Sequence, residues 1–279
     1  MAETQGLRRV LELVAPALRA AHQEGSFRPS SYATPLTVAS YALTHDHLVV
    51  VTATSSEAET LLEGVRALWG ERDDIALWPA WDTHPLERVS PDTSVMAERA
   101  LLAWRLASGD IPRVIIAPVR ALAQIGSPAT ATPLAMARGG EYDREEFLRT
   151  LVELGYRREH LVEHRAEFAV RGGIVDVWPA QSNEPLRLDF FGDEIDRLTT
   201  FDIANQRSMH DVARAIVAPA REWIPSATTR QRAEEMTKTH AWGRETFDRI
   251  AQGQLFDGME GWMGLFADCL LYTSDAADE

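Results

Sequence analysis

Apolar residues recur with two different periods along the chain, and the first half alternates short strands with helices. Short apolar runs predict strands at residues 48–51, 75–78 and 114–118. The run Leu-Val-Val-Val at 48–51 contains no polar residue, so we expect that strand to be buried on both faces, as in a parallel sheet. Helical spacing of apolar residues predicts helices at 7–22, 36–47, 57–68, from Ser90 to Gly109 and at 119–124. Strands and helices in this order indicate an α/β layer.

The middle of the chain has the two-residue period of an antiparallel sheet. Between residues 168 and 202, Val175 and Val177 alternate with Asp176, and Leu186 and Leu188 alternate with Arg187. Gly192-Asp193 separates two such runs and has the composition of a tight hairpin turn.

A single helix precedes this sheet. Residues 144–154 have helical spacing, with Asp143 in position to cap the first turn and Gly155 in position to end the last one. A loop is expected over 126–140. These elements predict a compact α+β domain over residues 135–212.

The remaining segments suggest that this α+β domain is an insertion. After residue 212 the chain shows a short strand at 216–219 and helices at 228–239 and 242–250. We therefore expect an α/β fold in which residues 1–134 and 213–268 form one parallel-sheet domain and 135–212 interrupt it. Residues 269–279 change to small and acidic side chains, which favours a truncation or a foreign tail.

Composition narrows the classes of function. The net charge is −14, which opposes adsorption to a nucleic-acid backbone unless a local basic patch exists. The single cysteine, Cys269, excludes an internal disulfide framework and fits a cytoplasmic protein. No secretory signal is evident, and no apolar run approaches the length of a membrane span, so no membrane partner is expected.

Two stretches resemble a phosphate-binding loop and a metal site, but they lack the residues that such sites require. The strand at 48–51 leads through Thr-Ala-Thr-Ser-Ser into a helix, yet residues 52–59 contain neither glycine nor lysine and place Glu57 and Glu59 where phosphate would sit. Asp82, His84 and Glu87 match no metal-ligand spacing, which favours capping and solvation. We therefore predict no catalytic residue, metal site or bound cofactor.

Charged residues of both signs occur on the antiparallel sheet. Arg171 and Arg187 occur near Asp176, Asp189 and Glu194, with aromatic residues beside them. Such a surface suits docking to another protein better than chemistry on a small molecule.

An ordered series of short motifs runs along the chain: Asp82-Thr83, Glu87-Arg88, Ser90-Pro91, Glu98-Arg99, Gly155-Tyr156-Arg157, Arg171-Gly172, Asp176, Pro179, residues 187–191, residues 193–196, Phe201-Asp202, Gln206-Arg207, residues 258–260 and Leu265-Phe266. This series resembles the N-terminal region of bacterial transcription-repair coupling factors, which is itself similar to the repair helicase UvrB.

The resemblance implies a degenerate, RecA-type helicase-like domain in two pieces with an inserted domain that contacts UvrA. RNA polymerase and DNA would be bound through other parts of the full-length protein, where an ATP-driven motor would also lie. The leading hypothesis is a non-catalytic module that recruits UvrA during transcription-coupled nucleotide excision repair. The alternative is a nucleotide-dependent DNA helicase subunit of the UvrB type.

The resemblance also nominates partner-binding residues. Arg171 can contact the partner or pair locally with Asp176 or Glu194, and Arg157 and Arg158 can contact it or be merely solvated. Of Phe190 and Phe191, which point to opposite faces of one strand, at most one can be core. Ala169 stands where UvrB has an arginine. The nominated residues are Arg157, Arg158, Arg171, Asp176, Phe191 and Glu194.

Overall fold

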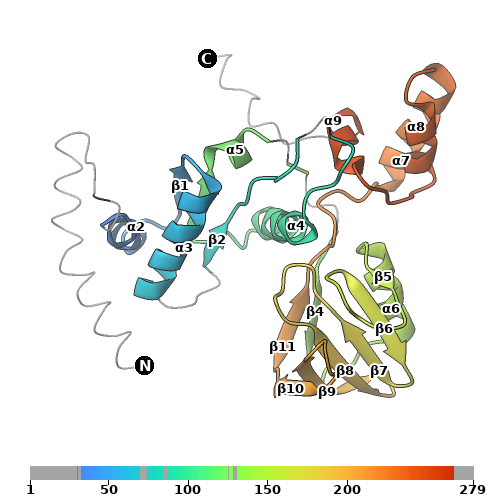
Figure 1. Ribbon diagram of the computed structural model, residues 1–279, viewed down its shortest axis with the longest axis horizontal. Helices are drawn as coiled ribbons and strands as arrows, with labels where there is room; N and C mark the ends of the chain where they lie inside the picture. Colours follow the sequence, from blue (N-terminus) through green and yellow to red (C-terminus); the bar gives the residue numbers. More distant parts are fainter. Residues whose placement is uncertain are drawn as a thin grey trace. The chain divides into compact units, whose positions relative to one another are not determined.

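The computed structural model describes residues 30, 33–69, 74–84, 87–124, 126–127 and 131–266 (Figure 1). The helix predicted at 7–22, Cys269 and the tail predicted at 269–279 lie outside these residues. The chain divides into two compact units, one containing residues up to Ala80 with Arg105–Gln124, the other containing Trp81–Trp104 with the residues after Gln124. Each unit has a hydrophobic core of its own.

The first unit is a small parallel α/β layer, as the sequence predicts. Its three-stranded sheet has the order β1-β3-β2, and both pairings are parallel. Apolar side chains of α2 and α3 pack on the sheet to form one core cluster. The elements are α2 (Thr34–Ala42), β1 (Leu48–Thr52), α3 (Ser55–Trp69), β2 (Ile75–Leu77), β3 (Val114–Pro118) and α5 (Val119–Leu122).

The prediction that the first strand is buried on both faces is wrong. Val49 and Val51 are 59% and 52% exposed, whereas Leu48 and Val50 pack on the core cluster. Strand β1 is an edge strand of this sheet, and the core formed with α2 and α3 includes only one of its faces. An unbroken apolar run therefore marks a half-buried strand here.

Helix α4 (Thr93–Ala107) begins later than the sequence predicts. Asp92, not Ser90, caps it, because the Asp92 carboxylate accepts from the Ser94 N–H and the Asp92 carbonyl from the Met96 N–H. The Ser90 hydroxyl instead donates to Glu260 and accepts from Arg221. Ser90 thus forms hydrogen bonds with residues that lie more than a hundred positions away along the chain, and it does not cap the helix.

The second unit contains an antiparallel domain built on a six-stranded sheet of order β10-β9-β8-β7-β6-β5. All its pairings are antiparallel except that of β5 with β6. A separate two-stranded sheet pairs β4 with β11. The elements are β4 (Leu134–Ala137), α6 (Arg144–Glu153), β5 (Arg157–Arg158), β6 (Glu167–Arg171), β7 (Ile174–Val177), β8 (Leu186–Phe191), β9 (Glu194–Phe201), β10 (Ser208–Asp211) and β11 (Arg214–Val217).

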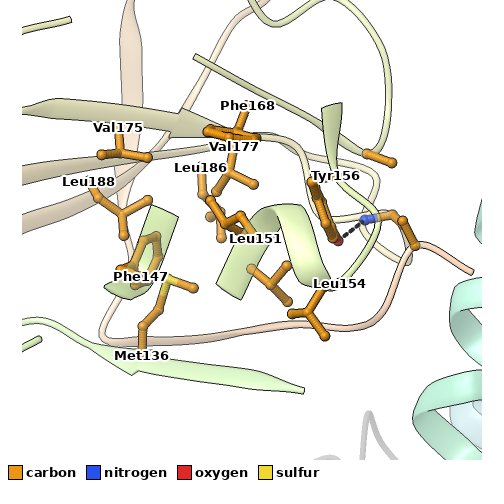
Figure 2. Close-up of a cluster of buried hydrophobic side chains, with 14 of the residues drawn as sticks. Met136, Phe147, Leu151, Leu154, Tyr156, Phe168, Val175, Val177, Leu186 and Leu188 are labelled. Atoms are coloured by element: carbon orange, nitrogen blue, oxygen red, sulfur yellow. Dashed lines mark hydrogen bonds between the residues drawn. The ribbon is translucent and has the colours of Figure 1, made fainter. Parts of the chain in front are cut away.

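One core joins α6 to both sheets of this domain. Phe147 and Leu151 on α6 are buried against apolar residues of the six-stranded sheet (Figure 2). Leu148 on the same helix belongs to this core as well. Met136 of β4 and Val217 of β11 belong to the same core. Strand β4 lies where the sequence predicts a loop, and β11 packs with this domain although the sequence assigns it to the segment that follows.

Several local predictions for this domain are confirmed. The Asp143 side chain accepts from the Glu146 N–H at the start of α6, and Gly155 has a φ of +88° just after its end. Gly192 has a φ of +65° in the turn between the paired strands β8 and β9. Backbone propensity and turn chemistry therefore agree with the tertiary pairing in this region.

The second unit also contains a helical part. Its aromatic core includes Trp81, Trp223 and Phe247. Beside it, the buried Glu222 carboxylate accepts from Arg99 Nε at 2.7 Å and from the Trp81 indole at 2.6 Å. The elements are α7 (Ala227–Thr239), α8 (Arg244–Ala251), the 3-10 helix η1 (Met259–Trp262) and α9 (Met263–Phe266). None of the helices in the described part of the chain is long and apolar enough to cross a membrane.

The buried Tyr156 hydroxyl gives a prediction about stability. It donates to the Ala218 carbonyl at 2.9 Å. It also accepts from the Ala180 N–H at 2.9 Å, the bond drawn as a dashed line in Figure 2. Tyr156→Phe should therefore lower the unfolding free energy by about 1–3 kcal/mol, because it leaves these groups unsatisfied. Urea titration at neutral pH measures this; an unchanged midpoint would contradict it.

The same hydroxyl gives an expected pH dependence. Burial raises the pKa of Tyr156 above its ordinary value, so the folded state keeps the neutral phenol. The contribution of this hydroxyl to the free energy of unfolding is complete below about pH 10. It is lost at higher pH, where the tyrosine of the unfolded chain ionises. The Tyr156→Phe variant should lose less stability on alkaline titration than the unsubstituted chain.

Candidate partner-binding surface

The face of the six-stranded sheet opposite α6 carries the charged residues that the sequence singled out. Asp176 on β7 lies beside Arg187 on β8 and Ala169 on β6 in one register row. The next row contains Arg171, Ile174, Asp189 and Arg197. The alternation predicted from the sequence thus separates these side chains from the core face.

Asp176 joins two arginines. Arg187 donates to both Asp176 oxygens, from Nε at 2.6 Å and from a terminal nitrogen at 2.9 Å, and Arg171 donates to the same carboxylate. Arg187 also donates to the Gln206 carbonyl at 2.8 Å. The hydrogen bonds from the guanidinium to Asp176 raise the pKa of Arg187, which keeps its charge fixed.

This geometry corrects the assignment of Asp176 as a partner-binding residue. The Asp176 side chain is 1% exposed, so it cannot touch another protein directly, and its role is to hold the arginines. For Arg171 the local pair with Asp176 does form, yet its side chain stays 44% exposed. Arg171 can therefore serve both as a structural partner and as a surface donor. Ala169 is buried among Val162, Phe201 and Trp178.

The tip of the β8–β9 hairpin presents one aromatic side chain. Phe191 is 83% exposed, whereas Phe190 packs on the core with its ring 5.7 Å from that of Phe147. This confirms the prediction that only one of the two phenylalanines belongs to the core. Glu194 lies opposite Phe191 across the hairpin and is also exposed.

Hydrogen bonds to another segment fix this hairpin tip. The Tyr142 N–H donates to the Asp193 carbonyl at 2.6 Å, and the Ile195 N–H donates to the Gly140 carbonyl at 3.0 Å. Phe191 is thus presented from a turn whose following limb, residues 193–195, is tied to residues 140–142 by backbone hydrogen bonds. We call the surface formed by Arg171, Ile174, Asp189, Arg197, Phe191 and Glu194 the outer strip.

Arg157 and Arg158 lie outside the outer strip. They form β5, and Arg157 donates to Glu167 at 3.1 Å, at the opposite end of β6 from Arg171. Glu167 is buried and also accepts from the backbone of Glu163 and His164. Both arginines are exposed, so they remain predicted contact residues, but the structure does not bring them together with Arg171.

The loop between β1 and α3 is closed by its own side chains. The Glu57 carboxylate accepts from the Ala53 N–H at 3.1 Å, and Thr54 Oγ1 accepts from the Glu57 N–H at 3.2 Å. A carboxylate therefore occupies the backbone donor that a phosphate group would need at this helix N-terminus.

The residues Asp82, His84 and Glu87 serve local structure. Asp82 accepts from the Asp92 N–H at 3.1 Å, and Glu87 accepts from the His84 N–H at 3.0 Å. Within the described residues no cluster of histidine, cysteine and acidic side chains could hold a metal ion.

Comparisons with known proteins place the antiparallel domain in a class. Residues 134–223 match the model of the UvrB interaction domain, a range that begins with β4 and ends at Trp223, just after β11.

The whole chain also has named relatives. It is 34% identical over 274 residues to a transcription-repair-coupling factor of Mycobacterium bovis, a match covering 90% of this chain and 22% of that protein. It is 34% identical over 209 residues to the factor of Myxococcus xanthus, covering 71% of this chain and 17% of the relative. The Escherichia coli factor is 32% identical over 199 residues, covering 67% and 17%.

The chain is therefore similar to transcription-repair coupling factors over most of its own length, and it spans about a fifth of the length of the curated relatives it matches.

The ion cluster around Asp176 predicts unequal effects of two substitutions. Asp176→Asn should lower the unfolding free energy by about 3–5 kcal/mol, because it leaves the nearly buried Arg187 without its counter-charge. Arg171→Ala should cost no more than about 1 kcal/mol, since that side chain is half exposed. Urea unfolding of both variants measures the difference; equal losses would contradict the assigned roles.

Proposed function

We propose that this chain is a docking module that recruits UvrA during transcription-coupled nucleotide excision repair. The observation that carries the proposal is the outer strip itself: an 83% exposed phenylalanine on a fixed hairpin, beside half-exposed arginine donors, in a domain that matches the UvrB interaction domain. Exposed aromatic and arginine side chains on rigid elements are the residues that most often dominate binding energy at protein interfaces.

The charges of the strip define the partner surface. Asp176 neutralises part of Arg171 but leaves nearly half of its side chain open, so the guanidinium can add one planar contact to a carboxylate of the partner. Phe191 needs an apolar pocket, and Glu194 across the hairpin needs a donor. The complementary face of UvrA would combine these three features.

The first unit is proposed to be a degenerate helicase-like domain of RecA type that does no chemistry. The parallel sheet supports this assignment, and the internal bond of Glu57 at the β1–α3 loop supports the loss of phosphate binding. In this proposal the segments predicted at 1–134 and 213–268 flank an inserted domain, which β4 and β11 extend slightly beyond its predicted bounds of 135–212. ATP, RNA polymerase and DNA are engaged by other parts of the full-length protein, and the location is cytoplasmic.

The alternative, a nucleotide-dependent helicase subunit of UvrB type, is favoured by one feature, the strand-loop-helix order of β1 and α3. An ATP titration with Mg²⁺ followed by calorimetry separates the two. We expect no saturable heat up to about millimolar ATP, the upper end of the range of KM values typical of enzymes. Saturable binding that Thr54→Ala or Glu57→Ala alters would establish the alternative.

The docking proposal predicts that Phe191→Ala and Arg171→Ala weaken binding to purified UvrA. Loss of an exposed hot-spot aromatic should raise Kd at least about tenfold, and loss of the arginine about fivefold. Surface plasmon resonance with immobilised UvrA measures both.

Matched controls for these variants lie on the other side of the domain. Val152 on α6 is 54% exposed and Arg149 is exposed on the same helix, so Val152→Ala and Arg149→Ala should leave Kd unchanged. If the controls lose as much affinity as the two strip variants, or if the unsubstituted chain shows no binding, the proposal is wrong.

A further inference from the structure

The helical part of the second unit contains a cavity unrelated to the outer strip. Its volume is about 470 Å³, and its lining includes Ala241, Gly243 and Arg244 at the start of α8, residues 256–258, Trp262 and Arg88. The volume is within the usual range of small-ligand sites. Three arginines, Arg88, Arg244 and Arg249, contribute to the lining.

These arginines are available for a ligand. Within the described part of the chain, Arg88 and Arg244 have no hydrogen-bond or ion-pair partner. The Arg249 guanidinium lies 4.0 Å from the centre of the Phe256 ring, which holds it in place without a counter-ion. Glu245 and Asp257 also line the cavity, and Asp257 is already engaged by the Ser90 N–H at 3.1 Å. Three arginines against two carboxylates give the cavity lining a net positive charge, although the net charge of the chain is −14.

The backbone on the Arg88 side of the cavity is fixed. Gly258 has a φ of +77° and packs so closely on Arg88 that an added Cβ would lie 2.6 Å from its carbonyl carbon. The Gly258 N–H donates to the Ser90 hydroxyl at 2.9 Å, and the same hydroxyl is bonded to Arg221 and Glu260. The Arg88 backbone is therefore positioned beside a partly buried polar network.

An aromatic platform adjoins the cavity. Trp242, between the lining residues Ala241 and Gly243, is 56% exposed. Its ring stacks on Trp262, which also lines the cavity, with centroids 6.4 Å apart and planes at 18°, and contacts Phe247 edge-on at 5.2 Å. The His240 ring also contacts the indole edge-on at 5.7 Å, so three rings support it while much of its surface faces solvent.

We infer that this cavity binds a phosphate of a single-stranded nucleic acid, with a neighbouring base stacked on Trp242. Guanidinium forks bind phosphate oxygens, and a supported, exposed indole accepts any unpaired base. Free phosphate uses only the arginines and leaves the platform unexplained. Duplex nucleic acid cannot stack on Trp242, because its bases are already stacked and paired. The site supplies a local basic patch in a chain whose net charge is strongly negative.

The test uses the full chain and a fluorescein-labelled oligothymidylate of about twelve nucleotides, within the length that single-strand sites cover. Anisotropy titrations at several salt concentrations give Kd and its salt dependence. Arg88→Ala and Arg244→Ala should each weaken binding and reduce the slope of log K against log salt by about 0.7 for each phosphate that is no longer neutralised. Trp242→Ala should weaken binding at least about fivefold with the slope unchanged.

The control is Arg232→Ala, an exposed arginine on α7 that does not line the cavity and should bind as the unsubstituted chain does. The inference is overturned if the oligonucleotide is not bound, if the cavity variants match the control, or if duplex of equal length competes equally well. If inorganic pyrophosphate binds the cavity and the oligonucleotide does not, the cavity is a small-anion site, and the inference is also overturned. None of these results depends on UvrA binding.

Discussion

The carboxylate of Asp176 organises the outer face of the six-stranded sheet. It is almost fully buried, and it is compensated by two donors from Arg187 and one from Arg171. A buried charge is tolerated only when its hydrogen bonds are complete, so β6, β7 and β8 must keep the register that brings these three side chains together. The same constraint leaves Arg171 facing outward at the edge of the cluster. Stability and recognition are therefore linked at one residue.

The inner face of that sheet contributes to stability, and we assign binding to its outer face. The inner face joins α6 and both sheets in one apolar core, which fixes the hairpin between β8 and β9. The outer face carries fixed charges. Phe191 lies at the hairpin tip beside this face and is not itself part of the core. A docking surface built in this way loses little conformational entropy on binding, because its backbone is already ordered.

Local sequence features predicted much of this arrangement. Asp143, Gly155 and Gly192 have direct backbone roles, and the two-residue period separates Phe190 from Phe191. Features that depend on residues far away in the sequence could not be predicted from local patterns. Strand β4 is four residues long and is recognised only through its pairing with β11, and the exposure of Val49 and Val51 follows from the place of β1 at a sheet edge. The burial of Asp176 depends on the register of β7 and β8, which no local pattern specifies.

A photo-crosslinking experiment tests most directly whether the outer strip faces UvrA. A benzoyl-phenylalanine placed at position 191 or, as the control, at position 152 on α6 reports which side of the domain the partner covers. We expect UvrA to be crosslinked from position 191 and not from position 152. Crosslinking from position 152 alone, or equally from both, would contradict the assignment of the outer strip as the docking surface.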